Sequence, residues 1–174
     1  MPSNIEIKAR IDSVQALLPR AQALADDAHA QRITQDDTFF SVPHGRLKLR
    51  VFADGAGELI HYHRADDDGP KLSDYVIAPV TDPDALRHTL ERACGLLGRV
   101  RKQRLLLLVG NTRVHLDSVQ GLGDFLELEV VLGPDQSPEQ GQAVARALMA
   151  QLGVGEQALV SGAYLDLLQA RPAA

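Results

Sequence analysis

The sequence predicts an α+β fold in which eight antiparallel strands form a closed or nearly closed β-tunnel, with a polar interior and with helices packed outside. Short segments of alternating polar and apolar residues are joined by turns rich in glycine, proline and aspartate, which is typical of antiparallel hairpins. The polar faces of these segments carry bases in some strands and carboxylates in others. An open sheet of this size would leave exposed edges, whereas a closed one would not. We therefore expect the sheet to curl with its charged face inward.

The composition is that of a single folded domain covering residues 1–174. With 45% hydrophobic and 24% charged residues, the chain can bury a core and is too apolar to be disordered. No apolar run has the length of a signal peptide or a membrane span, so we expect a cytoplasmic protein without a membrane partner. The net charge of −5 argues against a nucleic-acid partner. The single cysteine, Cys94, excludes an internal disulfide, and we expect a buried thiol rather than a nucleophile.

The first half of the chain contains most of the expected strands. Residues 4–9 alternate as a strand does, and residues 13–28 show apolar positions at helical spacing. We expect this helix to begin with a capping box formed by Asp12 and Gln15, and to be disturbed by Pro19. Four further strands are expected, separated by turn and loop signals: 33–40, 46–53, 58–64 and 71–78.

The second half alternates helices with the remaining strands. A helix is expected over 83–97, with Asp82 as its N-cap and Gly95 or Gly98 at its end. A hairpin then joins strands 99–109 and 112–119 through Gly110 and Asn111, and a last strand follows at 124–132. A helix over 138–152 begins with a capping box of Ser137 and Gln140, and 161–169 is expected to be a short helix.

The two faces of these strands carry different side chains. In strand 124–132, Glu127 and Glu129 share the face opposite Leu126 and Leu128. If each strand is considered alone, the pattern is also explained by a sheet with one face in solvent. The segregation of bases from carboxylates favours an enclosed interior instead. Such an interior needs a compensating ligand, because burying many charges is costly.

The residue types of this interior suit a triphosphate and a hard cation. Lysine and arginine neutralise phosphate, and arginine adds bidentate geometry. The bases that could do this are Lys8, Lys48, Arg50, Arg64, Lys102 and Arg104. Carboxylates would repel phosphate but can bind Mg²⁺ or Mn²⁺. The carboxylates that could do this are Glu6, Asp117, Glu127 and Glu129.

At these residues the sequence resembles the CYTH superfamily, which includes class IV adenylyl cyclases and thiamine triphosphatases. The family signature Glu-x-Glu-x-Lys reads Asn4-Ile5-Glu6-Ile7-Lys8 here. Further segments that resemble the family, in order, are Arg46–Arg50, Tyr62–Arg64, Gly69–Ser73, Lys102–Arg104, His115–Asp117 and Gly121–Glu129, and the segment 161–168 resembles its ending.

The resemblance implies a role for each matching residue. Glu6, Glu127 and Glu129 would hold Mg²⁺ or Mn²⁺, with Asp117 near the metal. The residues that would bind the triphosphate are Lys8, Lys48, Arg50, Arg64, Lys71, Lys102 and Arg104, and among them Lys8, Arg64 and Lys102 would be catalytic. One departure is Asn4, where the signature has glutamate. An amide oxygen can coordinate the metal but adds no charge, so a second metal ion is in doubt.

Three functions follow from such a tunnel. A class IV adenylyl cyclase would convert ATP to cyclic AMP and pyrophosphate, and this is the interpretation favoured by the Gly121–Phe125 and Gly69–Ser73 segments. A thiamine triphosphatase or tripolyphosphatase would hydrolyse the terminal phosphate. A non-catalytic module would only bind polyphosphate.

Several weaker signals allow two interpretations. His61 and His63 share a strand face and could bind zinc, but they are expected to point outward. His115 shares a face with Asp117 and either lines the tunnel or forms an ordinary hydrogen bond. Lys71, Ser73 and Tyr75 either line an entrance or lie on the surface. Asp66–Asp68 are expected to form a solvated loop. Arg99 and Arg101 form either a surface patch or part of a homodimer contact.

Overall fold

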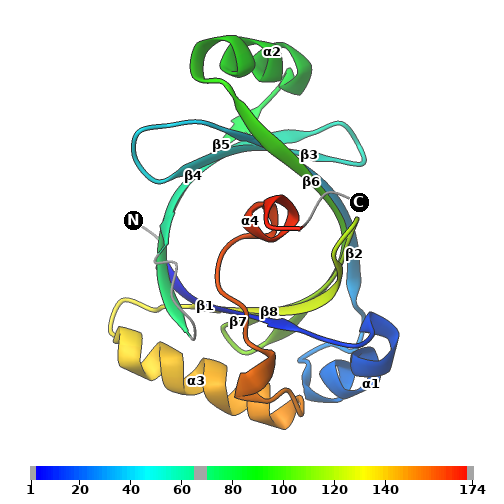
Figure 1. Cartoon of the computed structure of the whole chain (residues 1–174). Coiled ribbons are helices and arrows are strands. Elements are labelled where there is room, and N and C mark those ends of the chain that lie inside the picture. The colour runs from blue at the N-terminus through cyan, green and yellow to red at the C-terminus, as the bar shows by residue number, and fades with distance from the viewer. Residues whose placement is uncertain (1–2, 65–69, 172–174) are drawn as a thin grey trace.

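All eight strands belong to one closed antiparallel barrel, in the order β1-β5-β4-β3-β2-β6-β7-β8 (Figure 1). The structure is a computed structural model that describes residues 3–64 and 70–171, with the side chain of Arg64 left out. The strands are β1 (Ser3–Arg10), β2 (Gln31–Phe40), β3 (Arg46–Phe52), β4 (Gly57–Arg64), β5 (Lys71–Val80), β6 (Leu96–Val109), β7 (Thr112–Val119) and β8 (Gly123–Val131). Each strand pairs with two neighbours, so the predicted closure is confirmed and no edge remains.

Two helices cover one side of the barrel. α1 (Val14–Leu24) and α3 (Pro138–Gln151) pack on β1, β6, β7 and β8, where Ile5, Leu116 and Leu128 are completely buried. Gly141 allows this close approach, because a Cβ there would lie 2.7 Å from Cγ1 of Ile5. The apolar strand faces therefore point outward into a core shared with the helices.

The start of α1 differs from the prediction. Ser13 is its N-cap, and its hydroxyl accepts a hydrogen bond from the amide of Ala16 at 3.3 Å. The predicted cap, Asp12, is one residue too early. The helix also ends at Leu24 rather than at residue 28, and Pro19 lies within it. By contrast, the capping box of Ser137 and Gln140 forms at the start of α3 as predicted.

The helix between β5 and β6 is less buried than expected. α2 (Pro83–Cys94) begins at Asp82 as predicted and ends at Gly95, whose φ of 85° favours glycine. It therefore stops before residue 97, and β6 begins earlier than predicted, at Leu96. Because α2 projects beyond the strands (Figure 1), none of its residues is fully buried, and Cys94 is half-buried rather than buried.

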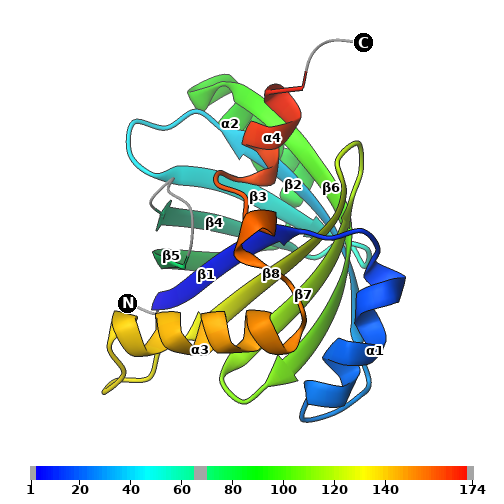
Figure 2. The same cartoon turned by 60° about the horizontal axis from the view of Figure 1, so that its bottom comes forward.

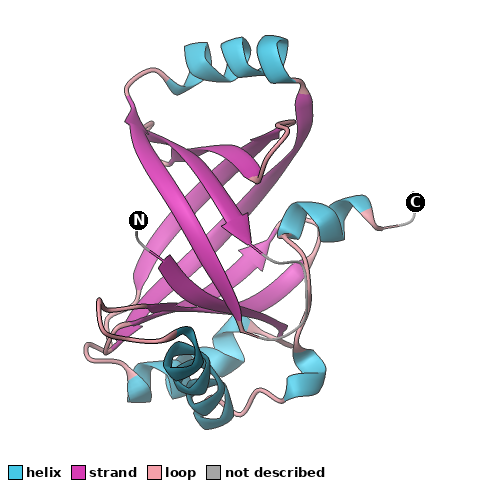
Figure 3. Ribbon diagram, turned by 90° about the vertical axis from the view of Figure 1, so that its left-hand side faces the viewer, coloured by secondary structure: helices cyan, strands magenta, loops and turns pink. Residues whose placement is uncertain are grey.

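The C-terminal segment closes one end of the barrel. After a short 3₁₀ turn, η1 (Glu156–Ala158), the chain crosses to α4 (Tyr164–Gln169), which lies across one mouth of the barrel (Figures 2 and 3). Tyr164 and Leu165 pack there against Phe39, Val100 and Phe125 in a second apolar cluster. The predicted short helix is confirmed, and its apolar side chains seal this end of the interior.

Candidate active site

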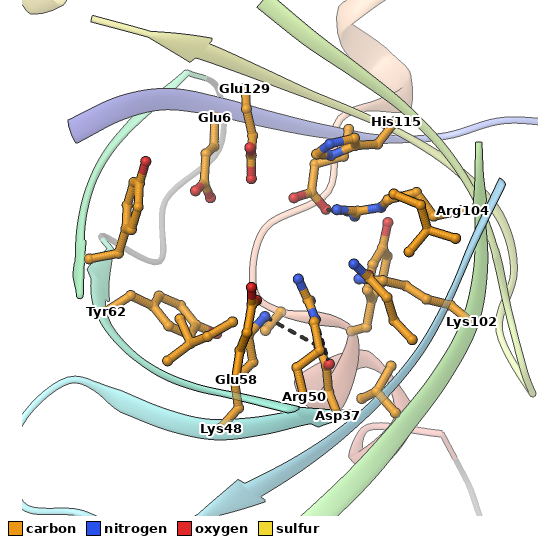
Figure 4. A pocket seen from close by; sticks show the side chains of 18 of the residues that line it. Glu6, Asp37, Lys48, Arg50, Glu58, Tyr62, Lys102, Arg104, His115 and Glu129 are labelled. Carbon is orange, nitrogen blue, oxygen red and sulfur yellow. Dashed lines mark hydrogen bonds and ion pairs between the residues drawn. The ribbon is translucent and has the colours of Figure 1, made fainter. Parts of the chain in front are cut away.

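The interior of the barrel is a cavity of about 380 Å³, lined by side chains from all eight strands and from the start of α4 (Figure 4). The inward faces predicted from strand alternation are confirmed for most of the proposed site. The predicted site residues that line the cavity are Asn4, Glu6, Lys8, Lys48, Arg50, Lys102, Arg104, Glu127 and Glu129. Asp117 and Lys71 are buried, but they are not among the described residues that line it.

Two arginines of the cavity, the half-buried Arg50 and the buried Arg104, are each held by a carboxylate on the neighbouring strand. Nε and Nη2 of Arg50 donate to Asp37 at 2.8 and 2.7 Å, and the same atoms of Arg104 donate to Asp117 at 2.7 and 2.6 Å. Both pairs follow from the strand register, which sets Asp37 opposite Arg50 and Asp117 opposite Arg104. Among the described residues, the hydrogen bonds of both guanidinium groups use only Nε and Nη2. Nη1 of each arginine is therefore available to a ligand.

Asp117 is held mainly by cations and by a tyrosine hydroxyl, and Nη2 of Arg104 links it to Glu127, at 2.6 Å and 3.6 Å respectively. Besides Arg104, it accepts a hydrogen bond from the hydroxyl of Tyr164 at 2.8 Å, and its side chain is 0% exposed. Burial opposes its ionisation, but Arg104 and Lys102 together lower the pKa of Asp117 to about 2. Asp117 is thus a permanently charged support for the cations. Asp117 is not one of the three side chains whose ligand atoms lie within 4.8 Å of one another, and its place near the metal stays a prediction.

Three amines, those of the buried Lys8 and Lys102 and of the half-buried Lys48, complete the cationic part of the cavity. Nζ of Lys48 lies 3.3 Å from Oδ2 of Asp37, and Nζ of Lys8 donates to the carbonyl of Gly162 at 3.1 Å. Lys102 lies 3.9 Å from Asp117 and 4.9 Å from the ring centroid of Tyr164. Burial and the positive charge of Arg104 lower the pKa of Lys102 to about 7. This amine can therefore gain a proton when an anion binds.

A group of metal-binding side chains lies on β7 and β8. His115, Glu127 and Glu129 each offer a ligand atom, and these atoms all lie within 4.8 Å of one another. Burial opposes ionisation of Glu127, but Lys8, Arg104 and Lys102 hold its pKa well below the usual range. Glu6 lies opposite Glu129 in the register, so its carboxylate faces the same part of the cavity (Figure 4).

The donor set fits a divalent cation. Two carboxylates and one imidazole can approach a common point, and the nearby Oδ1 of Asn4 is buried without a hydrogen-bond partner among the described residues. Burial of such an acceptor costs free energy unless a donor or a cation satisfies it. The substitution of asparagine for the first glutamate of the signature thus still leaves an oxygen facing the cavity.

His115 lines the cavity, in agreement with the first of its two interpretations, which placed it in the tunnel. Its ring is 3% exposed, and Nδ1 has no hydrogen-bond partner among the described residues. Burial and the charge of Arg104 lower the pKa of His115 to about 4, so the ring is neutral at physiological pH.

One wall of the cavity is aromatic and aliphatic rather than charged. Tyr62 pairs with Tyr75, and Ile60 pairs with Ile77, across β4 and β5, and all four side chains line the interior. The inward position of Tyr75 and of Ser73 resolves their two interpretations in favour of the cavity. We call the four residues Ile60, Tyr62, Tyr75 and Ile77 the apolar wall.

Sequence reasoning missed three charged residues of the cavity. Glu58 lies opposite Arg50, Asp37 holds Arg50, and Arg113 forms an ion pair with Glu129 at 3.1 Å. Strand alternation could have found Arg113, because it shares a face with His115 on the same strand. The same reasoning applies to Glu58, which shares a face with Tyr62.

Other predicted residues are not among those that line the cavity. Lys71 is 6% exposed and lies opposite Glu6, on the same strand face as Ser73, and its role in binding the triphosphate stays a prediction. The side chain of Arg64 and the Asp66–Asp68 loop fall outside the described residues. His61 contacts the ring of His63 and the carbonyl of His44, and the described residues place no further metal-binding side chain beside these two histidines.

The surface arginines are paired with one carboxylate. Nε and Nη2 of Arg99 donate to Asp36 at 2.6 and 2.7 Å, and Arg101 lies 3.2 Å from the same side chain. They therefore form a surface ion-pair network, and the homodimer stays a prediction. No helix of the described part of the chain has the length and apolar character needed to cross a membrane.

Solved structures share this fold. The chain is similar to the PH1012 protein from Pyrococcus horikoshii OT3, with 22% identity, a TM-score of 0.82, and coverage of 95% of this chain and 99% of that one. A candidate adenylate cyclase from Vibrio parahaemolyticus has 20% identity and a TM-score of 0.79, with 96% and 98% of the two chains covered. HpAC1 from Hippeastrum, described as having a dominant triphosphatase activity, has 16% identity and a TM-score of 0.68, with 97% and 95% covered.

The family assignment rests on the sequence itself. No curated protein matches the chain. The CYTH domain matches residues 3–164, a range that includes every strand of the barrel and the first residue of α4. The chain therefore belongs to the CYTH family, as the motifs along its strands predicted.

Proposed function

We propose that the cavity binds a nucleoside triphosphate with a divalent cation and converts it to a cyclic nucleotide and pyrophosphate, as a class IV adenylyl cyclase converts ATP. The observation that carries this proposal is that five bases and several carboxylates converge on one enclosed space. These bases are Lys8, Lys48, Arg50, Lys102 and Arg104. Bases enclosed in this way are stable in the folded protein only when internal counter-charges balance them. An anionic ligand would add the most to that stabilisation.

The phosphate chain would contact the cations that Asp37 and Asp117 hold in place. Each carboxylate uses two nitrogens of its arginine, so Nη1 of Arg50 and of Arg104 can donate to phosphate oxygens without breaking either pair. A negative ligand would raise the low pKa of Lys102 and so draw a proton onto its amine. Lys8 and Lys102, both beside Tyr164, are the candidates for stabilising charge at the reacting phosphate.

The cation would be held by Glu127 and Glu129, with Glu6 and Asn4 beside them. Mg²⁺ or Mn²⁺ bound there would neutralise phosphate charge and polarise a phosphoryl oxygen. The lowered pKa values of Glu127 and Glu129 keep both carboxylates ionised and ready to bind at neutral pH.

The apolar wall favours a nucleoside over inorganic tripolyphosphate. Tyr62 and Tyr75 offer ring faces or edges, and Ile60 and Ile77 offer aliphatic surface, none of which a bare polyphosphate would use. With the phosphates on the cations and the base against this wall, the ribose would lie between them. The 3′-hydroxyl could then attack the α-phosphorus, with pyrophosphate as the leaving group.

Hydrolysis of the terminal phosphate is the second candidate. It is supported by the two ionised carboxylates, which can accept hydrogen bonds from a water molecule near the phosphate chain. Thiamine triphosphate, whose organic part would also contact the apolar wall, is the substrate to compare with tripolyphosphate.

Product analysis separates these functions. The protein is incubated with ATP, thiamine triphosphate or tripolyphosphate in the presence of Mg²⁺ or Mn²⁺, and the products are resolved by chromatography. Cyclic AMP with pyrophosphate supports the cyclase, whereas orthophosphate from any of the three supports the hydrolase. Binding without turnover would reduce the protein to a polyphosphate-binding module. Arg50→Ala tests the cavity, and Arg101→Ala, on the outer surface, is its control.

A further inference from the structure

His115 occupies a position where a metal ligand is expected and a hydrogen bond is missing. It faces the cavity from β7, directly opposite Glu127 on β8, and Glu129 lies two pairs further along the same two strands, opposite Arg113. A ring nitrogen of His115 and one oxygen from each glutamate lie within 4.8 Å of one another. In Figure 4, His115 and Glu129 extend from the same side of the cavity.

The second observation is independent of this spacing. His115 is 3% exposed, and its Nδ1 atom has no hydrogen-bond partner among the described residues. Buried polar atoms without a partner are rare in folded proteins, because each has lost its hydrogen bonds to water without gaining a replacement. A buried imidazole that has an unpartnered Nδ1 and lies beside two carboxylates is explained if the ring has a ligand that the protein itself does not supply.

We propose that His115 donates a ring nitrogen to the divalent cation held by Glu127 and Glu129, so that the site binds a first-row transition metal such as Mn²⁺ in preference to Mg²⁺. Only the presence of a cation site is taken from the proposed function. The nitrogen ligand and the metal preference are additional to it.

The donor chemistry supports this preference. Magnesium strongly prefers oxygen ligands and gives up its water reluctantly. Imidazole suits transition metals such as iron, nickel, copper and zinc, whereas carboxylates suit Mg²⁺ and Mn²⁺ alike, so a nitrogen added to two carboxylates shifts the preference away from Mg²⁺. A site made only of Glu6, Glu127 and Glu129 would not discriminate in this way, so the nitrogen ligand is what the test must detect.

Pulsed electron paramagnetic resonance of bound Mn²⁺ detects the nitrogen directly. The protein is prepared with ¹⁵N-labelled histidine as the only labelled amino acid, and the electron spin echo is examined for ¹⁵N coupling to Mn²⁺. His115 is the only histidine among the described cavity-lining residues, so the label identifies the ligand. His115→Gln removes the proposed ligand, and His61→Gln, on the outer surface, is the matched control.

We expect ¹⁵N coupling in the wild type and in His61→Gln, and its loss in His115→Gln. Calorimetry of the same proteins should show Mn²⁺ affinity reduced at least about tenfold by His115→Gln, with a smaller reduction for Mg²⁺. Circular dichroism checks that the variant is folded, and the wild-type spectrum remains informative if it is not.

Three results would overturn the proposal. They are bound Mn²⁺ without ¹⁵N coupling, coupling that persists in His115→Gln, and failure of the wild type to bind Mn²⁺ at millimolar concentration. The first leaves the cation site of the proposed function in place, whereas the last removes both. Coupling in a protein without turnover would uphold the nitrogen ligand while the proposed reaction fails.

Discussion

The two sides of the barrel differ in what covers them and in what they present to the cavity. On the side of β1, β6, β7 and β8, α1 and α3 bury the outer face, and the inner face carries the buried charges of Arg104, Asp117 and Glu127. On the side of β4 and β5, the outer face is open, with Leu72 and Val76 42% and 51% exposed. The inner face there carries the apolar wall, with Glu58 and Ser73 as its polar members on the same two strands.

This difference separates two tasks of the site. Charged groups act on phosphate and metal most strongly when their positions are fixed before the ligand arrives, and burial on both faces of a strand fixes them. Apolar contacts depend less on exact placement, so the uncovered side can serve the organic part of a substrate. The predictions below test this division, beginning with the largest effect.

Loss of Asp117 should damage the covered side most. Asp117→Asn removes the charge that holds Arg104 and Lys102, and breaking such a buried pair costs about 3–5 kcal/mol in the free energy of unfolding. Urea denaturation measures this loss. Asp74→Asn on β5, a half-buried residue, is the comparison and should cost less than about 0.5 kcal/mol. Equal costs for the two variants would contradict the division.

Loss of Glu129 should affect metal binding more than folding. Glu129→Gln keeps the shape of the side chain but removes a charge that the metal needs, so calorimetry should show Mn²⁺ affinity reduced at least about tenfold. Glu156→Gln, at an exposed acid outside the barrel, is the control. Unchanged Mn²⁺ affinity in Glu129→Gln would show that the metal does not bind in this acidic group.

Arg50→Ala should weaken tripolyphosphate binding by about 1.5–3 kcal/mol, the range for a hydrogen bond to a charged group. The variant removes Nη1, the proposed phosphate donor, although it also leaves Asp37 without its bidentate partner. Isothermal calorimetry measures the affinity, and the free energy of unfolding shows how much of the effect is structural. An affinity equal to that of Arg101→Ala would exclude Arg50 from the phosphate site.

Triphosphate affinity should fall as the pH rises above about 7. The pKa of Lys102 is about 7 in the empty cavity, because burial and Arg104 disfavour its charge. Phosphate favours the protonated amine, so binding at pH 8 requires proton uptake and weakens by at most tenfold per pH unit. Calorimetry at pH 8 in buffers of different ionisation enthalpy counts the protons. Titration of the ligand itself contributes equally for the wild type and for Lys102→Gln, so the variant should take up fewer protons on binding. An unchanged number of protons would show that Lys102 is not the group that takes up the proton.

The smallest expected effect lies on the uncovered side. Tyr75→Leu should weaken ATP binding by about 1 kcal/mol, since it removes an aromatic ring from the apolar wall while keeping an apolar side chain. Tripolyphosphate binding should not change. If both ligands weaken equally, the wall contacts phosphate or supports the fold instead of binding a nucleoside.

Strand alternation was sufficient to predict most of the cavity. In β8, Glu127 and Glu129 share one face because side chains alternate, and the buried leucines opposite them point to the helices. Asp37 could not be chosen over its neighbour Asp36 from the sequence, because the choice depends on which residue the register sets opposite Arg50. Asp36 instead binds Arg99 on the outer surface.

Tertiary contacts decided what the sequence left open. The pattern of 161–169 predicts a helix, but only packing of Tyr164 against Phe125 brings it to the mouth of the barrel. Similarly, the sequence alone does not distinguish the carboxylate of Asp117 from that of Glu127. In the structure, Asp117 accepts hydrogen bonds from Arg104 and Tyr164 and so supports the cations. That Nδ1 of His115 has no hydrogen-bond partner in the described part of the chain is visible only once the strands are assembled.

A crystal structure of the protein soaked with tripolyphosphate and Mn²⁺ tests the central claim most directly. We expect the phosphate chain inside the barrel, in contact with Nη1 of Arg50 and of Arg104, and the anomalous signal of Mn²⁺ between the chain and Glu127. Phosphate density confined to the outer surface, or a cavity that keeps its water with both ligands present, would contradict the account.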